Sequence, residues 1–166
     1  MITLRETGSG LASAHQGRHF NSRTALRQTV AIGTPVSDWQ SELLALTARK
    51  RDGSVRCSTA VDAECAQLID TAATAGKKVL LIVTDTSKTG LIVPGISTAW
   101  ALKQRWPAQV EVMVVSCQFR VSTATIRAYV EHGYMVALTG SKFVDGPTFS
   151  GVMLIPRLTA ARHRGV

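Results

Sequence analysis

Short apolar runs rich in β-branched residues recur through the second half of the chain. Residues 79–83, 110–115 and 135–138 form three such runs, and each is typical of a buried strand. Segments with helical spacing of apolar residues separate them, at 97–106 and 122–132. This alternation of strand and helix predicts right-handed crossover connections and therefore a parallel sheet.

Turn and capping residues bound the predicted helices. Pro107 prevents the first helix from continuing, Ser122 stands at the N-cap position of the second, and Gly133 follows its last turn. A fourth apolar run at 151–155 comes after the loop 144–148, which is too short to contain a crossover helix. We therefore expect this fourth strand to run antiparallel to its predecessor.

Weaker patterns precede these elements. Residues 2–4 predict a short strand, and 61–75 predict a helix with its apolar positions at helical spacing. A capping-box spacing at 37–40 predicts the start of another helix, which would carry Leu43 and Leu46.

The elements together predict one α/β domain over residues 1–156, in which helices flank a mostly parallel sheet as three layers, with one antiparallel strand near the C-terminus. The chain has 166 residues, of which 45% are hydrophobic and 18% charged. A domain of this length buries roughly 70% of its unfolded surface, so it needs no disulfide or metal to fold. The basic residues 157–166 predict a frayed C-terminal tail.

The cysteines and the N-terminal residues indicate the cellular compartment of the protein. Cys57, Cys65 and Cys117 lack the even number and the spacing of a disulfide framework, which favours free thiols and a cytoplasmic location. The sequence has no run of 18 apolar residues and does not begin like a signal peptide, so neither a membrane span nor secretion is expected. No cysteine pair has zinc-ligand spacing, and we interpret His15 and His19 as surface residues, so no metal site is predicted.

The strong positive charge of the chain is compatible with anionic partners, which could be nucleic acid, an anionic membrane or phosphorylated small molecules. The formal net charge is +8 and the pI is about 10.0. Arg18, Arg23, Arg27 and the basic turn at 49–53 could form a surface for nucleic acid. No nucleic-acid-binding motif is present, so this alternative rests on charge alone.

Polar residues follow each of the three predicted parallel strands. They are Thr-Asp-Thr-Ser-Lys-Thr-Gly at 84–90, Ser-Cys-Gln-Phe-Arg at 116–120 and Thr-Gly-Ser-Lys-Phe at 139–143. Open parallel sheets bind ligands outside the carboxyl ends of their strands, so these segments could surround a phosphorylated aromatic ligand or an anionic substrate. The glycines of a P-loop are missing around the first segment, and no Gly-x-Ser-x-Gly elbow occurs, which excludes both motifs.

The order and spacing of these segments resemble a known family. Residues 115–120, 139–143 and 146–151 are similar to the large domain of fold-type I pyridoxal-phosphate enzymes, in the class V aminotransferase and cysteine desulfurase branch, and within it to uncharacterised bacterial proteins. Residues 85–90 resemble the substrate-side turn of that branch, so the resemblance covers nearly the whole chain. It implies a pyridoxal-phosphate-dependent transferase or lyase that acts on an amino-acid-type substrate through a lysine Schiff base.

The resemblance also implies roles for residues at matching positions. Lys142 would be the catalytic lysine that forms the Schiff base. Gln118 would hydrogen-bond the phenolic oxygen of the cofactor, while Thr139 and Ser141 would help bind its phosphate.

Ser116 stands where the family has the aspartate that keeps the pyridine nitrogen protonated. A hydroxyl can hydrogen-bond an unprotonated nitrogen, but it cannot hold a proton there as a carboxylate does. The cofactor is therefore expected to be a poorer electron sink, with impaired or lost activity. Thr86 and Ser87 would bind substrate, because they match the substrate-side turn.

The resemblance implies a domain that is truncated at both ends. Relative to the family, the chain begins after the phosphate-binding loop and ends before the small C-terminal domain. The missing segments would leave apolar surface bare, so we expect a homo-oligomer. An inactive truncated remnant is a further interpretation, beside the pyridoxal-phosphate protein and the nucleic-acid-binding protein.

Overall fold

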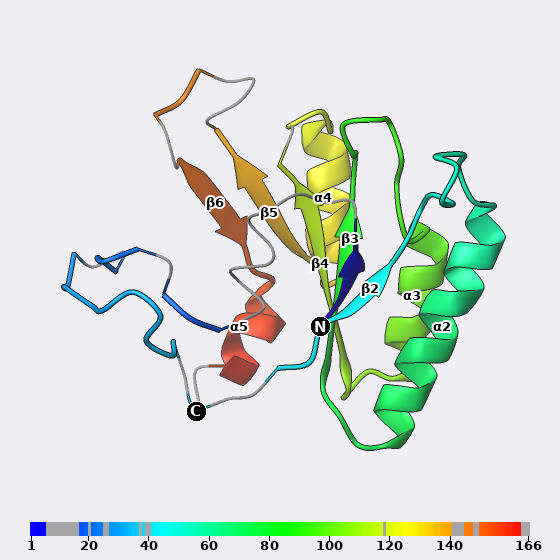
Figure 1. The fold of residues 1–166 in the computed structure, drawn as a ribbon, viewed down its shortest axis with the longest axis horizontal. Helices are drawn as coiled ribbons and strands as arrows, with labels where there is room; N and C mark the ends of the chain where they lie inside the picture. The colour runs from blue at the N-terminus through cyan, green and yellow to red at the C-terminus, as the bar shows by residue number, and fades with distance from the viewer. Residues whose placement is uncertain are drawn as a thin grey trace.

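A computed structural model describes residues 1–5, 17–19, 21–24, 27–36, 38, 41–117, 119–140, 145–147 and 150–163. Its strands form one sheet in the order β2-β1-β3-β4-β5-β6 (Figure 1). All neighbouring pairs are parallel except β5 and β6, which confirms the mostly parallel sheet and the antiparallel strand. The strands are β1 Ile2–Leu4, β2 Leu44–Leu46, β3 Val79–Thr84, β4 Val110–Ser116, β5 Met135–Thr139 and β6 Gly151–Leu154.

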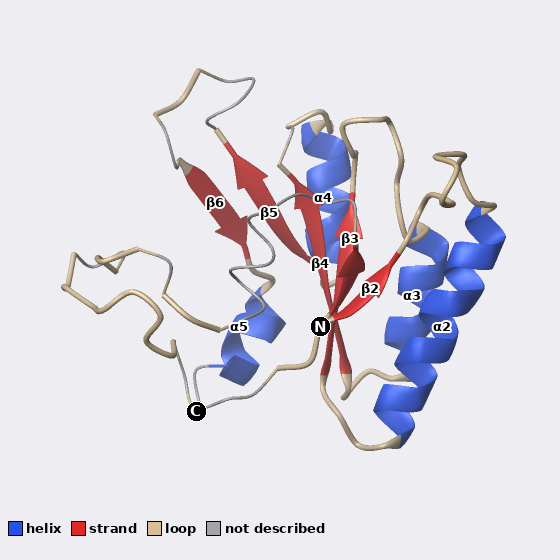
Figure 2. Cartoon of the chain, in the orientation of Figure 1, coloured by secondary structure: helices blue, strands red, loops and turns tan. Residues whose placement is uncertain are grey.

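Helices flank the sheet on both sides, as the predicted α/β class requires (Figure 2). The helices of the described residues are α2 Ser58–Thr74, α3 Ile96–Arg105, α4 Thr123–Glu131 and α5 Arg157–His163. Cys65 of α2, Ala99 of α3 and Tyr129 of α4 belong to one core cluster, so these three helices cover the same face. The short helix α5 lies on the opposite side of the sheet.

The ends of α3 and α4 form where the turn residues predicted them. The hydroxyl of Ser122 accepts a hydrogen bond from the Thr125 amide at 3.0 Å, which caps the first turn of α4. Gly133 follows α4 with a φ of 78°, in the left-handed region that a residue without Cβ adopts at little cost. Helix α3 ends with Trp106 as its C-cap, directly before Pro107.

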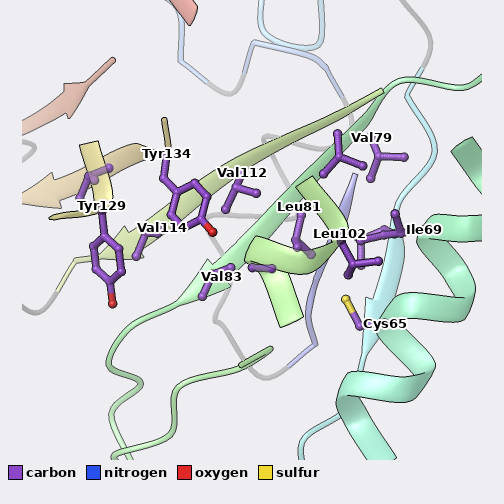
Figure 3. Close-up of a cluster of buried hydrophobic side chains, with 14 of the residues drawn as sticks. Cys65, Ile69, Val79, Leu81, Val83, Leu102, Val112, Val114, Tyr129 and Tyr134 are labelled. Carbon is purple, nitrogen blue, oxygen red and sulfur yellow. The ribbon is translucent and has the colours of Figure 1, made fainter. Parts of the chain in front are cut away.

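Alternate residues of the central strands form the core between the sheet and helices α2, α3 and α4 (Figure 3). Val79, Leu81 and Val83 of β3 face the helices, and each is at most 5% exposed. The inward residues of β4 lie directly beside them in register and are fully buried. This packing holds the carboxyl ends of β3 and β4 at the same level.

The prediction of a helix that carries Leu43 and Leu46 is wrong. Residues Leu44–Leu46 instead form β2, which pairs in parallel with β1, and Leu46 is fully buried in the core cluster. A short apolar run has no periodicity long enough to separate strand from helix, so the partner strand decides its structure. Ser37, Trp39 and Gln40, the predicted start of that helix, lie outside the described residues.

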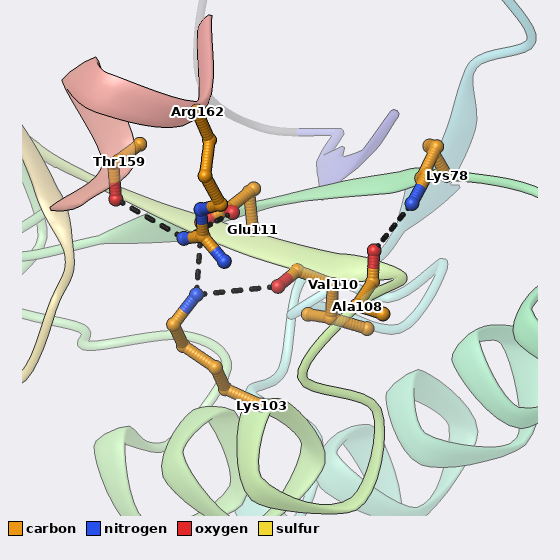
Figure 4. A network of polar contacts seen from close by, with 7 residues as sticks. All are labelled: Lys78, Lys103, Ala108, Val110, Glu111, Thr159 and Arg162. Carbon is orange, nitrogen blue, oxygen red and sulfur yellow. Dashed lines mark hydrogen bonds and ion pairs between the residues drawn. The ribbon is translucent and has the colours of Figure 1, made fainter.

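The predicted fraying of the C-terminal segment is also wrong for the residues of α5. Thr159 is 1% exposed, and Arg162 forms an ion pair of 2.8 Å with Glu111 of β4. Lys103 of α3 reaches the same carboxylate at 2.8 Å from the other side of the strand (Figure 4). Glu111 therefore connects the two helix layers through the sheet. Residues 164–166 lie outside the described part.

Strand β6 and the residues after it carry exposed apolar side chains at one edge of the sheet. Val152 is 53% exposed, Met153 48% and Ile155 48%. An uncharged edge strand with apolar side chains is prone to pair with another chain. The homo-oligomer stays a prediction: sedimentation equilibrium at micromolar concentration should give a mass above that of one chain. A compact monomer would contradict it.

Among the described residues, no helix combines the length and apolar character needed to cross a bilayer.

Candidate functional site

The carboxyl ends of β3, β4 and β5 lie side by side. The register pairs Thr84 with Val115 and Ser116 with Leu138, so the polar segments that follow these strands leave the sheet at one end. We call this region the carboxyl end of the sheet. The sequence predicted that these three segments would meet, and the strand register brings their starting points together. This is also where ligands bind in open parallel sheets.

Ser116 is the last residue of β4 and is fully buried. Its side chain points toward the helices, on the same face as Val114, because strand side chains alternate. The hydroxyl has no hydrogen-bond partner among the described residues. A buried hydroxyl without a partner costs about 1–3 kcal/mol. The hydroxyls of Thr3, Thr84, Tyr134 and Ser150 are buried without a partner as well, and Ser116 is the one of these residues that ends β4.

A buried carboxylate lies beside Ser116. Asp85 follows β3 directly and is 3% exposed. Its side chain accepts hydrogen bonds from the Tyr129 hydroxyl at 2.5 Å and from the Thr86 hydroxyl at 2.8 Å. Burial raises the pKa of Tyr129 well above its usual range, and the hydrogen bond to Asp85 raises it further. Tyr129 thus stays a hydrogen-bond donor throughout the physiological pH range.

Sequence reasoning assigned no role in the site to Asp85 or Tyr129. A usable signal existed for each. Asp85 is the first residue after a buried strand, and Tyr129 belongs to the helix predicted over residues 122–132, where a tyrosine that packs on the sheet needs a partner for its hydroxyl. Figure 3 shows Tyr129 beside Val114, toward the carboxyl end of β4.

The predicted substrate residues use their hydroxyls locally. Thr86 donates to Asp85, as described above. The Ser87 hydroxyl accepts from the Leu91 amide at 2.9 Å, and the Ser87 amide donates to the Leu91 carbonyl at 2.9 Å. Ser87 therefore closes its own turn, while Thr86 orients the buried carboxylate.

Thr139 ends β5 and points to the face opposite Ser116, because Ser116 lies in register with Leu138. Its hydroxyl donates to the Ser150 carbonyl at 2.9 Å, which joins the two ends of the segment between β5 and β6. The Gly146 amide closes the same segment by donating to the Gly140 carbonyl at 2.8 Å. A Cβ at Gly146 would lie 2.7 Å from that carbonyl oxygen, so no larger residue fits.

Three of the predicted site residues, Lys142, Gln118 and Ser141, lie outside the described residues. Their described neighbours fix where their segments begin. Gln118 follows Cys117 at the end of β4, and Lys142 belongs to the closed segment that leaves β5 at Gly140. Both segments therefore start at the carboxyl end of the sheet.

Comparison with known proteins finds no protein-family model that matches the chain and no matching curated protein. Within the described part of the chain, no three His, Cys, Asp or Glu side chains are grouped so that they could hold a metal ion. The site is therefore defined by its own chemistry: a buried carboxylate held by two hydroxyl donors, and an unpartnered hydroxyl beside it.

Proposed function

We propose that the chain binds pyridoxal phosphate through Lys142 and acts as a transferase or lyase on an amino-acid-type substrate. The observation that carries this proposal is the buried, unpartnered hydroxyl of Ser116. It stands at the strand end where the fold-type I family, which the sequence resembles, contacts the ring nitrogen of its cofactor. A ligand nitrogen at this place would satisfy the hydroxyl.

The arrangement of the strands supports the same proposal. The lysine segment leaves β5 and returns in the antiparallel strand β6, and its two ends are joined by the Thr139 and Gly146 hydrogen bonds. This closed segment starts beside the end of β4, where Ser116 lies.

Different residues of the chain would contact different parts of the cofactor and the substrate. Bound pyridoxal phosphate would supply an electron sink for bonds at the substrate α-carbon. In the proposal, Lys142 holds the cofactor covalently, Gln118 contacts its phenolic oxygen, and Ser141 contacts its phosphate. The Thr139 hydroxyl, which was also predicted to bind the phosphate, donates instead to the Ser150 carbonyl. Thr86 and Ser87 border the substrate side.

Titration with pyridoxal phosphate tests the proposal. We expect the wild-type protein to develop the near-ultraviolet or visible absorbance of a lysine Schiff base, because a lysine amine condenses with the aldehyde of the cofactor. Lys142→Ala should abolish this band. Lys88→Ala is the matched control, since Lys88 also follows a parallel strand but is exposed in the substrate-side turn, and it should keep the band. A wild-type protein without the band, or a Lys142→Ala variant that retains it, would contradict the proposal.

Two alternatives give different results in simple experiments. An inactive remnant predicts no band at all. Nucleic-acid binding predicts retention on DNA or RNA that is lost as salt increases. Some of the arginines proposed for such a surface brace their own loops: Arg18 donates to the Gly33 carbonyl at 2.7 Å and Arg49 to the Gly53 carbonyl at 2.8 Å. These contacts indicate that Arg18 and Arg49 stabilise the loops in which they lie.

A cytoplasmic location is part of the same proposal. Cys57 and Cys65 are free thiols, and no disulfide is found among the described residues. Free thiols are typical of proteins kept in a reducing compartment, where pyridoxal-phosphate chemistry on amino acids can take place.

A further inference from the structure

The carboxylate of Asp85 is buried without a cation. Its two hydrogen-bond donors, the hydroxyls of Tyr129 and Thr86, are neutral. Among the described residues no lysine, arginine or histidine forms an ion pair with it. Burial of a charge is costly unless an opposite charge compensates it. The site therefore favours a ligand that brings a positive charge to Asp85.

Asp85 and Ser116 are neighbours on the same face of the sheet. The last registered pair of β3 and β4 is Thr84 with Val115, and the Asp85 amide continues the pairing by donating to the Val115 carbonyl at 3.1 Å. One residue further along each strand, the side chains of Asp85 and Ser116 point the same way, separated by about the 4.8 Å spacing of adjacent strands. A single planar ring is large enough to contact both groups.

We propose that Asp85 is the carboxylate that pairs with the protonated ring nitrogen of bound pyridoxal phosphate, in place of the aspartate that Ser116 has replaced. This inference rests on the proposed function. Asp85 reaches the site from β3 rather than β4, and Ser116 provides a second, neutral contact. The N–H⁺ group of the ring donates to a carboxylate oxygen of Asp85, which supplies the missing positive charge.

Tyr129 and Thr86 act as positioning residues for this carboxylate. Tyr129 holds one oxygen of Asp85 from α4, and Thr86 holds the other from the neighbouring position in the chain. Each oxygen retains a lone pair for a ligand donor. Because Asp85 is 3% exposed and Ser116 fully buried, the ring must displace the atoms that cover them. Once bound it is shielded from water, which strengthens the ion pair.

The protonation state of the ring nitrogen tests the inference without any measurement of activity. Pyridoxal phosphate labelled with ¹⁵N in the ring would be bound to the full chain and its nitrogen chemical shift recorded. We expect a protonated nitrogen in the wild-type protein and an unprotonated nitrogen in Asp85→Asn. The double variant Asp85→Asn/Ser116→Asp should restore the protonated signal, because it returns a carboxylate to the end of β4. Asp52→Asn, in an exposed turn, is the control and should leave the signal unchanged.

A second variant keeps the test decisive if Asp85→Asn does not fold. Ser116→Ala retains Asp85 and should keep the nitrogen protonated. An unprotonated nitrogen in the wild-type protein, or a protonated one in folded Asp85→Asn, would overturn the inference while leaving cofactor binding through Lys142 intact. Failure of the proposed function looks different, because the wild-type protein would then show no Schiff-base absorbance at all.

Discussion

Replacement of Leu81 by alanine should lower the free energy of unfolding by about 2–5 kcal/mol, a large part of the roughly 5–15 kcal/mol that a domain of this kind has. Leu81 is fully buried in β3, where it lies in register between Ile2 of β1 and Val112 of β4. The substitution removes apolar contacts and leaves a cavity that the tightly paired strands cannot close. Urea denaturation followed by circular dichroism would measure the loss.

Leu158 provides the matched control for this experiment. It carries the same side chain in α5 but is 81% exposed. Leu158→Ala should therefore change the free energy of unfolding by no more than about 0.5 kcal/mol. Equal effects of the two substitutions would mean that Leu81 is not in the core and that β3 is not a central strand.

Stability should fall steadily as the pH rises from 9 to 12. Burial, together with the nearby charges of Asp62 and Glu64, raises the pKa of Cys65 from 9.0 to about 12. Burial raises the pKa of Tyr134 from 10.0 to about 12, and the pKa of Tyr129 is raised as well. Each group stays neutral longer in the folded chain than in the unfolded chain. The contribution of each group to the free energy of unfolding is complete at a pH below the pKa of that group in the unfolded chain. It is lost as the pH rises through the pKa of the group in the folded chain.

The midpoint of urea denaturation, measured across this pH range, checks the expectation. In the Cys65→Ala variant the urea midpoint should begin to fall at a higher pH than in the wild-type protein. Cys65 has a lower pKa in the unfolded chain than Tyr129 and Tyr134, and the substitution removes it. Cys57→Ala is the control: Cys57 is exposed, and its hydrogen bond with Thr59 lowers the pKa of its thiol, so it cannot cause the alkaline loss. A midpoint that stays constant up to pH 12 would show that these groups are not buried as neutral species.

The second half of the fold was predictable because its signals are long and mutually consistent. The apolar runs that became β3, β4 and β5 are at least four residues long, and capping residues such as Ser122 bound one of the helices between them. Residues 44–46 could not be assigned in the same way, since a three-residue strand has no periodicity of its own. Helix α5 was missed because its anchor, Glu111, lies on a distant strand.

The site was only partly predictable, for a similar reason. The position of Ser116 at a strand end follows from the local pattern, and so does the grouping of the three polar segments. The environment of Asp85 does not, because its partner Tyr129 is 44 residues away in the chain and reaches it only when α4 packs on the sheet. The missing partner of the Ser116 hydroxyl is likewise a property of the packed core.

We propose that Lys142 carries pyridoxal phosphate. Borohydride reduction after mixing with pyridoxal phosphate, followed by peptide mapping, tests it most directly, because reduction fixes the cofactor on the lysine that bound it. We predict that the label is found on the peptide that contains Lys142 and on no other. Label scattered over exposed lysines such as Lys50, Lys77 and Lys88, or no label at all, would contradict the claim.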